Sequence, residues 1–208
     1  MVRTRLAPLP ETADELIVMA NSLGAGKGSL FLRERATETV LKSTDLSDAR
    51  VLAFATHALV AGELGGLAEP ALVLTPPRKG TPTDDGLLTA SEVATLKLNS
   101  DLVILSACNT AASDGTPNAD ALSGLAKAFF YAGSRSLLVS HWPVQSDAAV
   151  KLTTKMLKVI AKNNKIGRSE ALRHSMLALM EDKSNPPEFA HPAYWAPFVV
   201  VGEGGASR

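Results

Sequence analysis

The chain has 208 residues, of which 46% are hydrophobic and 20% are charged, a composition that indicates one globular domain and excludes disordered and collagen-like chains. Its 21 Lys and Arg residues balance 21 Asp and Glu residues, so the net charge does not favour nucleic acid or an acidic membrane as a partner. A single cysteine, Cys108, excludes an internal disulfide and any metal site that requires two cysteine ligands.

Several segments carry apolar residues at helical spacing, and most of them have a cap or stop signal at one end. The clearest is 120–132, in which Leu122, Leu125 and Phe129 fall on one face and Gly133 stands where the helix would stop. The first predicted helix is 12–23, with a Thr12–Glu15 capping box at its start and Gly24 as its stop. A short helix with a Thr89–Glu92 capping box follows, and then the helix 120–132. Two further helices are predicted to be capped by Ser146 and by Ser169.

Short runs of Val, Leu and Ile lie between these helices and predict buried strands. They are residues 50–56, 71–74, 102–106, 136–140 and 198–201. The run 102–105 has no polar alternation, which is typical of a parallel strand covered on both faces. The alternation of strands and helices therefore predicts an α/β fold, a doubly wound and mostly parallel sheet with helices on both faces.

Patterns that would indicate other classes of function are incomplete. The most hydrophobic stretch, residues 51–61, is shorter than the roughly 20 apolar residues of a membrane span, and the first residues have no apolar core of a secretion signal. Residues 24–28 resemble a phosphate loop but lack its first glycine and its closing Ser or Thr. His141, His174 and His191 have no metal-ligand spacing. We therefore expect a cytoplasmic protein with no membrane partner, no metal and no cofactor.

Two residues with chemical reactivity end predicted strands. His57 follows the run that begins at Arg50, and Cys108 follows the run that begins at Asp101, 51 positions further along the chain. If these strands are parallel neighbours, their carboxyl ends lie about 5 Å apart, and an imidazole there would raise the thiolate fraction of the cysteine. Taken singly, Cys108 also fits a buried apolar residue and His57 a hydrogen-bonded edge histidine. Together they favour a catalytic pair.

The motifs around these residues resemble the CHAT domain, a relative of caspases and separases that is often attached to tetratricopeptide repeats. The matching segments are Phe54-Ala-Thr-His57, Asp85–Glu92, Asp101–Thr110, Leu125–Gly133 and Trp142-Pro-Val144. The resemblance covers nearly the whole chain and implies one caspase-like domain over residues 1–208 that lacks the N-terminal part of complete family members. It implies that His57 is the general base and Cys108 the nucleophile of a cysteine endopeptidase acting on a protein or peptide substrate.

The resemblance also implies roles for residues beside the pair. The backbone amides of Ala58 and Cys108 would hold the oxyanion, although the family usually has glycine where this chain has Ala58 and, after the cysteine, Ala111. Ser106 would line the primary specificity pocket, and Asp147 would meet a basic substrate side chain, so we expect cleavage after Arg, with Lys second. Asp147 fits equally well as a residue that stabilises the first turn of its helix.

The sequence leaves two alternatives to the peptidase. The first is a catalytically silent interaction or scaffold module beside tetratricopeptide-repeat segments in a longer protein. The losses of glycine at Ala58 and Ala111 favour this alternative, and the His57–Cys108 pair argues against it. The second is a hydrolase or transferase for small molecules that uses the same thiol on a similar sheet.

Overall fold

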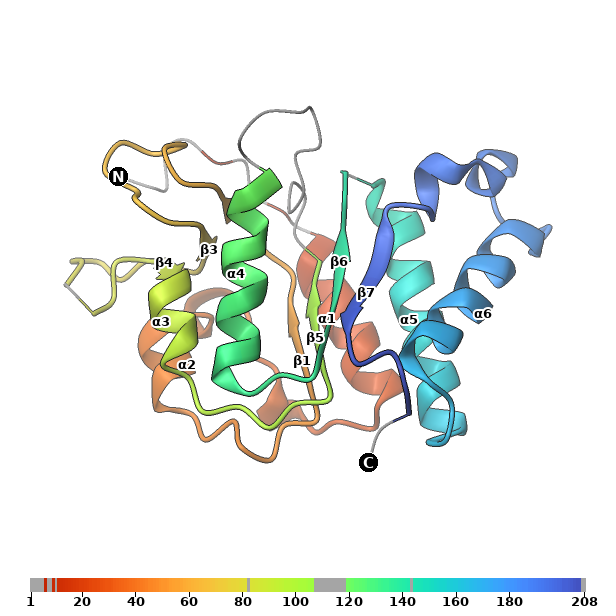
Figure 1. Cartoon of the computed structure of the whole chain (residues 1–208), viewed down its shortest axis with the longest axis horizontal. Coiled ribbons are helices and arrows are strands. Elements are labelled where there is room, and N and C mark those ends of the chain that lie inside the picture. Colours follow the sequence, from red (N-terminus) through yellow and green to blue (C-terminus); the bar gives the residue numbers. More distant parts are fainter. Residues whose placement is uncertain are drawn as a thin grey trace.

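A computed structural model describes the backbone of residues 6, 9, 11–81, 83–106, 119–142 and 144–206. Its main sheet has the strand order β1-β5-β6-β7, in which β1, β5 and β6 are parallel and β7 is antiparallel to β6 (Figure 1). The strands are β1 Val51–Phe54, β5 Leu102–Leu105, β6 Ser136–Ser140 and β7 Phe198–Gly202. All residues of β5 and β6 are buried, as the unbroken apolar run in β5 predicts.

A second, smaller sheet packs beside the first and has the antiparallel order β2-β3-β4. Its strands are β2 Ala58–Leu59, β3 Ala71–Val73 and β4 Leu87–Thr89. The prediction that residues 71–74 form a strand of the main sheet was therefore wrong in its location. A parallel crossover needs a dozen or more residues and usually a helix, and residues 60–70 contain no helix, so this stretch returns as an antiparallel partner of β2.

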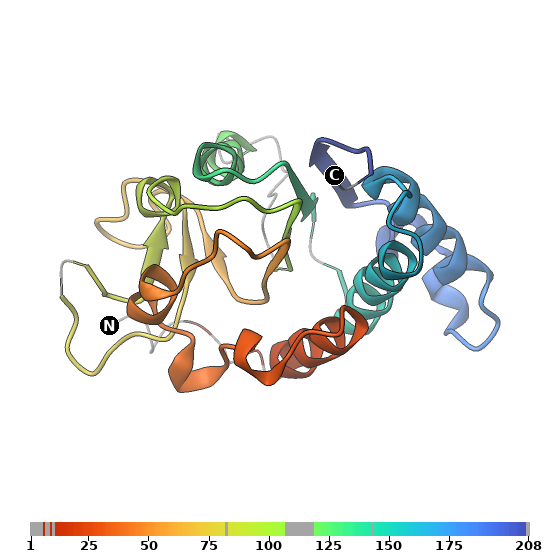
Figure 2. The ribbon, with the colours of Figure 1, turned by 90° about the horizontal axis from the view of Figure 1, so that it is seen from below.

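The helices cover both faces of the main sheet, and Figure 2 shows the two layers, with α3 and α4 on one side and α1, α5 and α6 on the other. The α-helices are α1 Glu11–Ser22, α2 Glu38–Ser43, α3 Ala90–Ala94, α4 Ala119–Ala132, α5 Ser146–Lys162 and α6 Arg168–Glu181, and the 3-10 helices are Lys27–Ser29, Arg33–Arg35, Pro187–Ala190 and Pro192–Tyr194. This arrangement confirms the predicted α/β class, with parallel strands in the majority in the main sheet. Within the described residues, no helix combines the length and the apolar composition that crossing a membrane requires.

The two faces of the sheet belong to different apolar cores. Phe54, Val103 and Leu105 face a core that α4 completes with Phe129, whose ring lies 5.5 Å from that of Phe54. On the opposite face, Leu102 and Ile104 meet residues of α1, α5 and α6. Burial of both faces therefore holds the parallel strands in place.

The predicted helix ends are partly confirmed. The Thr89–Glu92 capping box is present at α3, with both side-chain hydrogen bonds formed. Gly133 ends α4 with φ +110°, and a Cβ there would lie 2.2 Å from the carbonyl oxygen of Leu98, so glycine is required by both its conformation and its surroundings. Gly24 also has a positive φ at the end of α1, as its predicted stop requires.

Three predicted caps were wrong because the helices begin earlier than the capping pattern suggests. Helix α1 begins at Glu11, so Thr12 lies in its first turn and donates its hydroxyl to Leu9 O at 2.8 Å. Gln145 and Gly167 occupy the N-cap positions of α5 and α6, neither with a side-chain cap, which places Ser146 and Ser169 inside the helices.

Candidate functional site

The carboxyl ends of β1 and β5 lie side by side. Their pairing runs from Val51 with Leu102 to Phe54 with Leu105, so partners differ by 51 positions throughout. The backbone amide of Ser106 donates to Phe54 O at 2.9 Å, which continues the contact past the last strand residues. The predicted parallel neighbours are therefore confirmed, and His57 lies three residues beyond the end of β1.

Cys108, three residues beyond the end of β5, belongs to the segment 107–118, which lies outside the described residues together with Ala111. The predicted sulfur–imidazole pair thus has one member in the described part of the chain.

His57 is half-buried, and the second sheet holds its backbone. Its carbonyl oxygen accepts a hydrogen bond from Val73 N at 2.8 Å, and the hydroxyl of the preceding Thr56 donates to Val73 O. The residue also lines a cavity of about 650 Å³, which lies between β1 and the start of α1. His57 therefore borders a space large enough to hold part of a ligand.

Ala58 follows in β2, where it is buried and pairs with Leu72 of β3. Because His57 and Val73 form a hydrogen-bonded pair, the next pair in an antiparallel ladder does not exchange hydrogen bonds. The amide of Ala58 consequently points away from β3. Arg33 is the one described non-glycine residue with a positive φ, so Ala58 adopts a conformation that alanine tolerates without strain.

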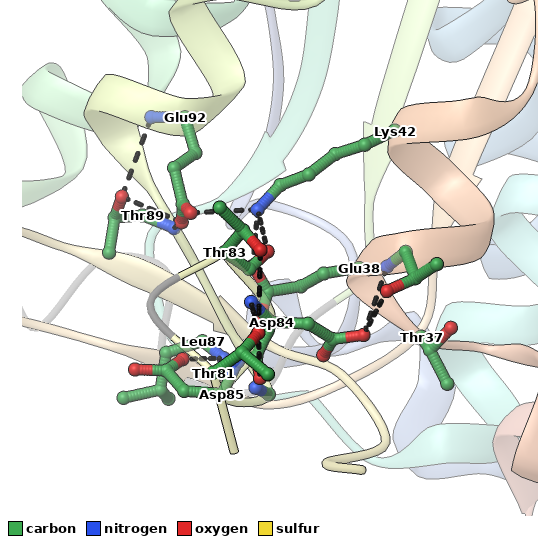
Figure 3. Close-up of polar contacts among 12 residues, drawn as sticks. Thr37, Glu38, Lys42, Thr81, Thr83, Asp84, Asp85, Leu87, Thr89 and Glu92 are labelled. Carbon is green, nitrogen blue, oxygen red and sulfur yellow. Dashed lines mark hydrogen bonds and ion pairs between the residues drawn. The ribbon is translucent and has the colours of Figure 1, made fainter.

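A polar network joins the second sheet to α2 (Figure 3). Glu38, only 1% exposed, accepts hydrogen bonds from the backbone amides of Asp85 and Gly86 at 2.9 and 2.7 Å. Lys42 bridges Glu38 and Glu92 at 2.6 and 2.7 Å. Burial disfavours the charge of Lys42, but the two carboxylates outweigh that effect and raise its pKa. The network thereby fixes β4, and through β3 the backbone at His57.

Ser106 points to a buried acid on the first helix. Its hydroxyl donates to Glu15 Oε1 at 2.5 Å, and Glu15 is only 6% exposed. Burial raises the pKa of Glu15 above its ordinary value, and the bond from Ser106 offsets this only in part. The sequence predicts only a capping role for Glu15. The sequence signal for its burial is its position four residues before Met19, on the face that α1 buries.

Asp147 lies in the first turn of α5 and is exposed, whereas the preceding Ser146 lines a small cavity together with Glu15 and Ser106. His141, which follows β6 at the same edge of the sheet, is also exposed. The structure therefore brings Ser106 close to a buried acid other than the predicted Asp147.

The other histidines and the tryptophans have local partners. His174 Nε2 lies 3.0 Å from Glu170 Oε1, and His191 Nδ1 accepts from Ala193 N at 3.2 Å. The indole of Trp142 donates to Ala193 O, and Trp195 packs against the core between the sheet and α5. In the described ranges, no three His, Asp or Glu side chains gather as metal ligands would.

Comparison with known proteins agrees with the motifs. The family model of the CHAT domain matches residues 1–203. Tetratricopeptide repeat protein 28 of Mus musculus and that of Homo sapiens are each 28% identical to this chain over an alignment 238 residues long, gaps included, which covers 97% of this chain but 9% of the relative. The chain thus spans about a tenth of the length of these curated relatives. Because the family model covers nearly all of its residues, the chain belongs to the CHAT domain family, a caspase-like peptidase family.

Proposed function

We propose that this chain is a cysteine endopeptidase in which Cys108 is the nucleophile and His57 the general base, and that it cleaves a protein substrate after a basic residue. The observation that carries the proposal is the register of β1 and β5. Their partners differ by 51 positions, which is also the separation of His57 and Cys108, and each of these residues follows its strand by three positions.

The chemistry requires such a pair because a free thiol with a pKa near 8.5 is only a few per cent ionised at pH 7. In the proposed reaction, His57 accepts the thiol proton while sulfur attacks the scissile carbonyl carbon. Collapse of the tetrahedral intermediate breaks the C–N bond, and the imidazolium returns the proton to the leaving amine. Water, deprotonated by His57, then hydrolyses the thioester and releases the carboxylate product and the free thiol.

The developing oxyanion requires donors beside the thiol. The outward direction of the Ala58 amide in β2 supports its role as one donor, and the amide of Cys108 would be the second. The extended backbone of Ala58 also supports this role, because alanine adopts that conformation without the positive φ that favours glycine.

The alkylation rate of Cys108 tests the pair directly, since the chain has no other cysteine to react. We expect iodoacetamide to label Cys108 at pH 7 roughly tenfold faster than an unperturbed thiol, with the excess lost in His57→Ala. His141→Ala is the matched control, because it removes an exposed histidine from the same sheet edge and should leave the rate unchanged. Equal rates in wild type and His57→Ala would refute the coupling.

A fluorogenic peptide library then identifies the reaction. We expect turnover after Arg and Lys that Cys108→Ala abolishes. Turnover of small thioesters alone would instead indicate the small-molecule hydrolase, and an unreactive Cys108 without turnover would indicate the silent scaffold module. The names of the two relatives support tetratricopeptide-repeat segments as partners of this domain.

A further inference from the structure

A small cavity lies at the carboxyl ends of β5 and β6, between the start of α1 and the start of α5. Its volume is about 50 Å³, and its lining includes Glu15, Ser106, Ser140, Val144, Ser146 and Phe198. A space of this size holds one or two waters or a group of a few heavy atoms, such as the end of a long side chain. It opens beside Ser106, two residues before Cys108.

Glu15 makes this cavity chemically unusual. Its carboxylate is buried, and its one hydrogen bond within the described chain comes from Ser106. No Lys, Arg or His of the described residues forms an ion pair with it, in contrast to the buried Glu38 and Asp101. A buried carboxylate without a cation destabilises a fold, whereas an amide or apolar side chain would not carry that cost. Such groups concentrate at binding and catalytic sites.

We propose that Glu15 is the acidic group of the primary specificity subsite, where it binds the guanidinium of a substrate arginine; this inference rests on the proposed peptidase function. Ser106 joins the carboxylate to the end of β5, and in the sequence it stands two positions before the proposed nucleophile. The second carboxylate oxygen makes no hydrogen bond in the described chain. If the Ser106 hydroxyl gives up its hydrogen bond to Oε1, both oxygens of Glu15 can accept hydrogen bonds from the two N–H groups of a guanidinium.

Glu15 fits this role better than Asp147 for a physical reason. Asp147 is exposed at the first turn of α5, where water and salt screen its charge. The charge of Glu15 is held away from water, where attraction for a cation is stronger. On these grounds Glu15 of α1, in place of Asp147 of α5, is the proposed acidic group of the subsite.

Binding of butylguanidine, an analogue of the arginine side chain, tests the subsite without requiring catalysis. We would measure it by NMR titration in the Cys108→Ala protein, with uncharged butylurea as the reference ligand. We expect Glu15→Gln to weaken butylguanidine binding at least tenfold while butylurea binding stays the same. Asp14→Asn is the matched control, because Asp14 is an exposed acid on the same helix and should have no effect. Thermal unfolding of each variant verifies that it is folded.

Two results would overturn the inference. One is equal butylguanidine affinity in Glu15→Gln and its parent, and the other is a loss confined to Asp147→Asn.

Peptide cleavage separates this inference from the proposed function. Cys108-dependent turnover that keeps its arginine preference in Glu15→Gln would overturn the subsite and leave the peptidase standing. An unreactive Cys108 combined with Glu15-dependent butylguanidine binding would overturn the peptidase and leave Glu15 as a guanidinium site.

Discussion

A buried carboxylate, that of Asp101, lies at the amino end of β5, away from the proposed site. Its neutralisation should strongly destabilise the protein. Asp101, 3% exposed, accepts from Arg50 Nε at 2.6 Å and Arg135 Nη1 at 2.8 Å, and Arg168 Nη2 lies 3.2 Å from its Oδ1. Arg168 is itself only 2% exposed and is the first residue of α6. The change Asp101→Asn would remove the carboxylate that forms the ion pair with the buried Arg168.

The three arginines contribute unequally to the expected loss. Arg50 and Arg135 are 52% and 27% exposed, so solvent compensates much of their charge. Removing one partner of a buried ion pair costs about 3–5 kcal/mol, and we expect the lower end, about 3 kcal/mol, because asparagine keeps one acceptor oxygen. For a chain of this size, that loss lowers Tm by roughly 6–12 °C.

Urea unfolding followed by circular dichroism measures this loss, and a second substitution identifies its origin. Glu170→Gln is the matched control, because it makes the same chemical change in an exposed pair with Arg173, 2.7 Å away, and should hardly alter stability. Adding Arg168→Met to Asp101→Asn should recover about 1–3 kcal/mol relative to additive losses. An Asp101→Asn protein as stable as Glu170→Gln, or a strictly additive double variant, would refute the reasoning.

The same contacts predict further measurable effects. Burial opposes the charge of Asp101, but the arginines outweigh this effect and lower its pKa. The stability that Asp101 contributes is therefore complete above about pH 4 and is lost as pH falls through its folded-state pKa. An acid titration should show the difference in stability between wild type and Asp101→Asn becoming smaller over that pH range. The pKa of Glu15 is raised, so wild type should lose stability as pH rises from about 4.3 through the folded-state pKa, and Glu15→Gln should be the more stable protein at pH 8 but not at pH 4, as pH-dependent Tm values would reveal. Gly133→Ala forces alanine into φ +110° and against Leu98 O, and should cost more than about 1 kcal/mol in urea unfolding, unlike a change of Gly26 to Ala, where a Cβ meets nothing within 4 Å.

Local patterns in the sequence predicted much of what positions the candidate site. The uniformly apolar run at 102–105 indicated a strand buried on both faces, and the stop at Gly133 indicated the end of α4. The separation of His57 and Cys108 matched the register that β1 and β5 adopt. These features depend on residues close together in the chain, or on strands whose burial requires one composition, so a linear reading captures them.

Local sequence patterns did not predict contacts between distant segments of the chain. Whether residues 71–73 join the main sheet or an antiparallel one depends on the path of the connecting chain, and no local pattern encodes it. Glu15 shows the same limit, because a glutamate on a helix is normally exposed and becomes buried here through the end of β5 that packs against it, 91 positions away. Motif and period therefore indicate the family, most of the strands and helices, and the two residues proposed to react. Only packing decides which carboxylate is withdrawn from water, and this burial is the reason that Glu15 is proposed to bind a cationic side chain.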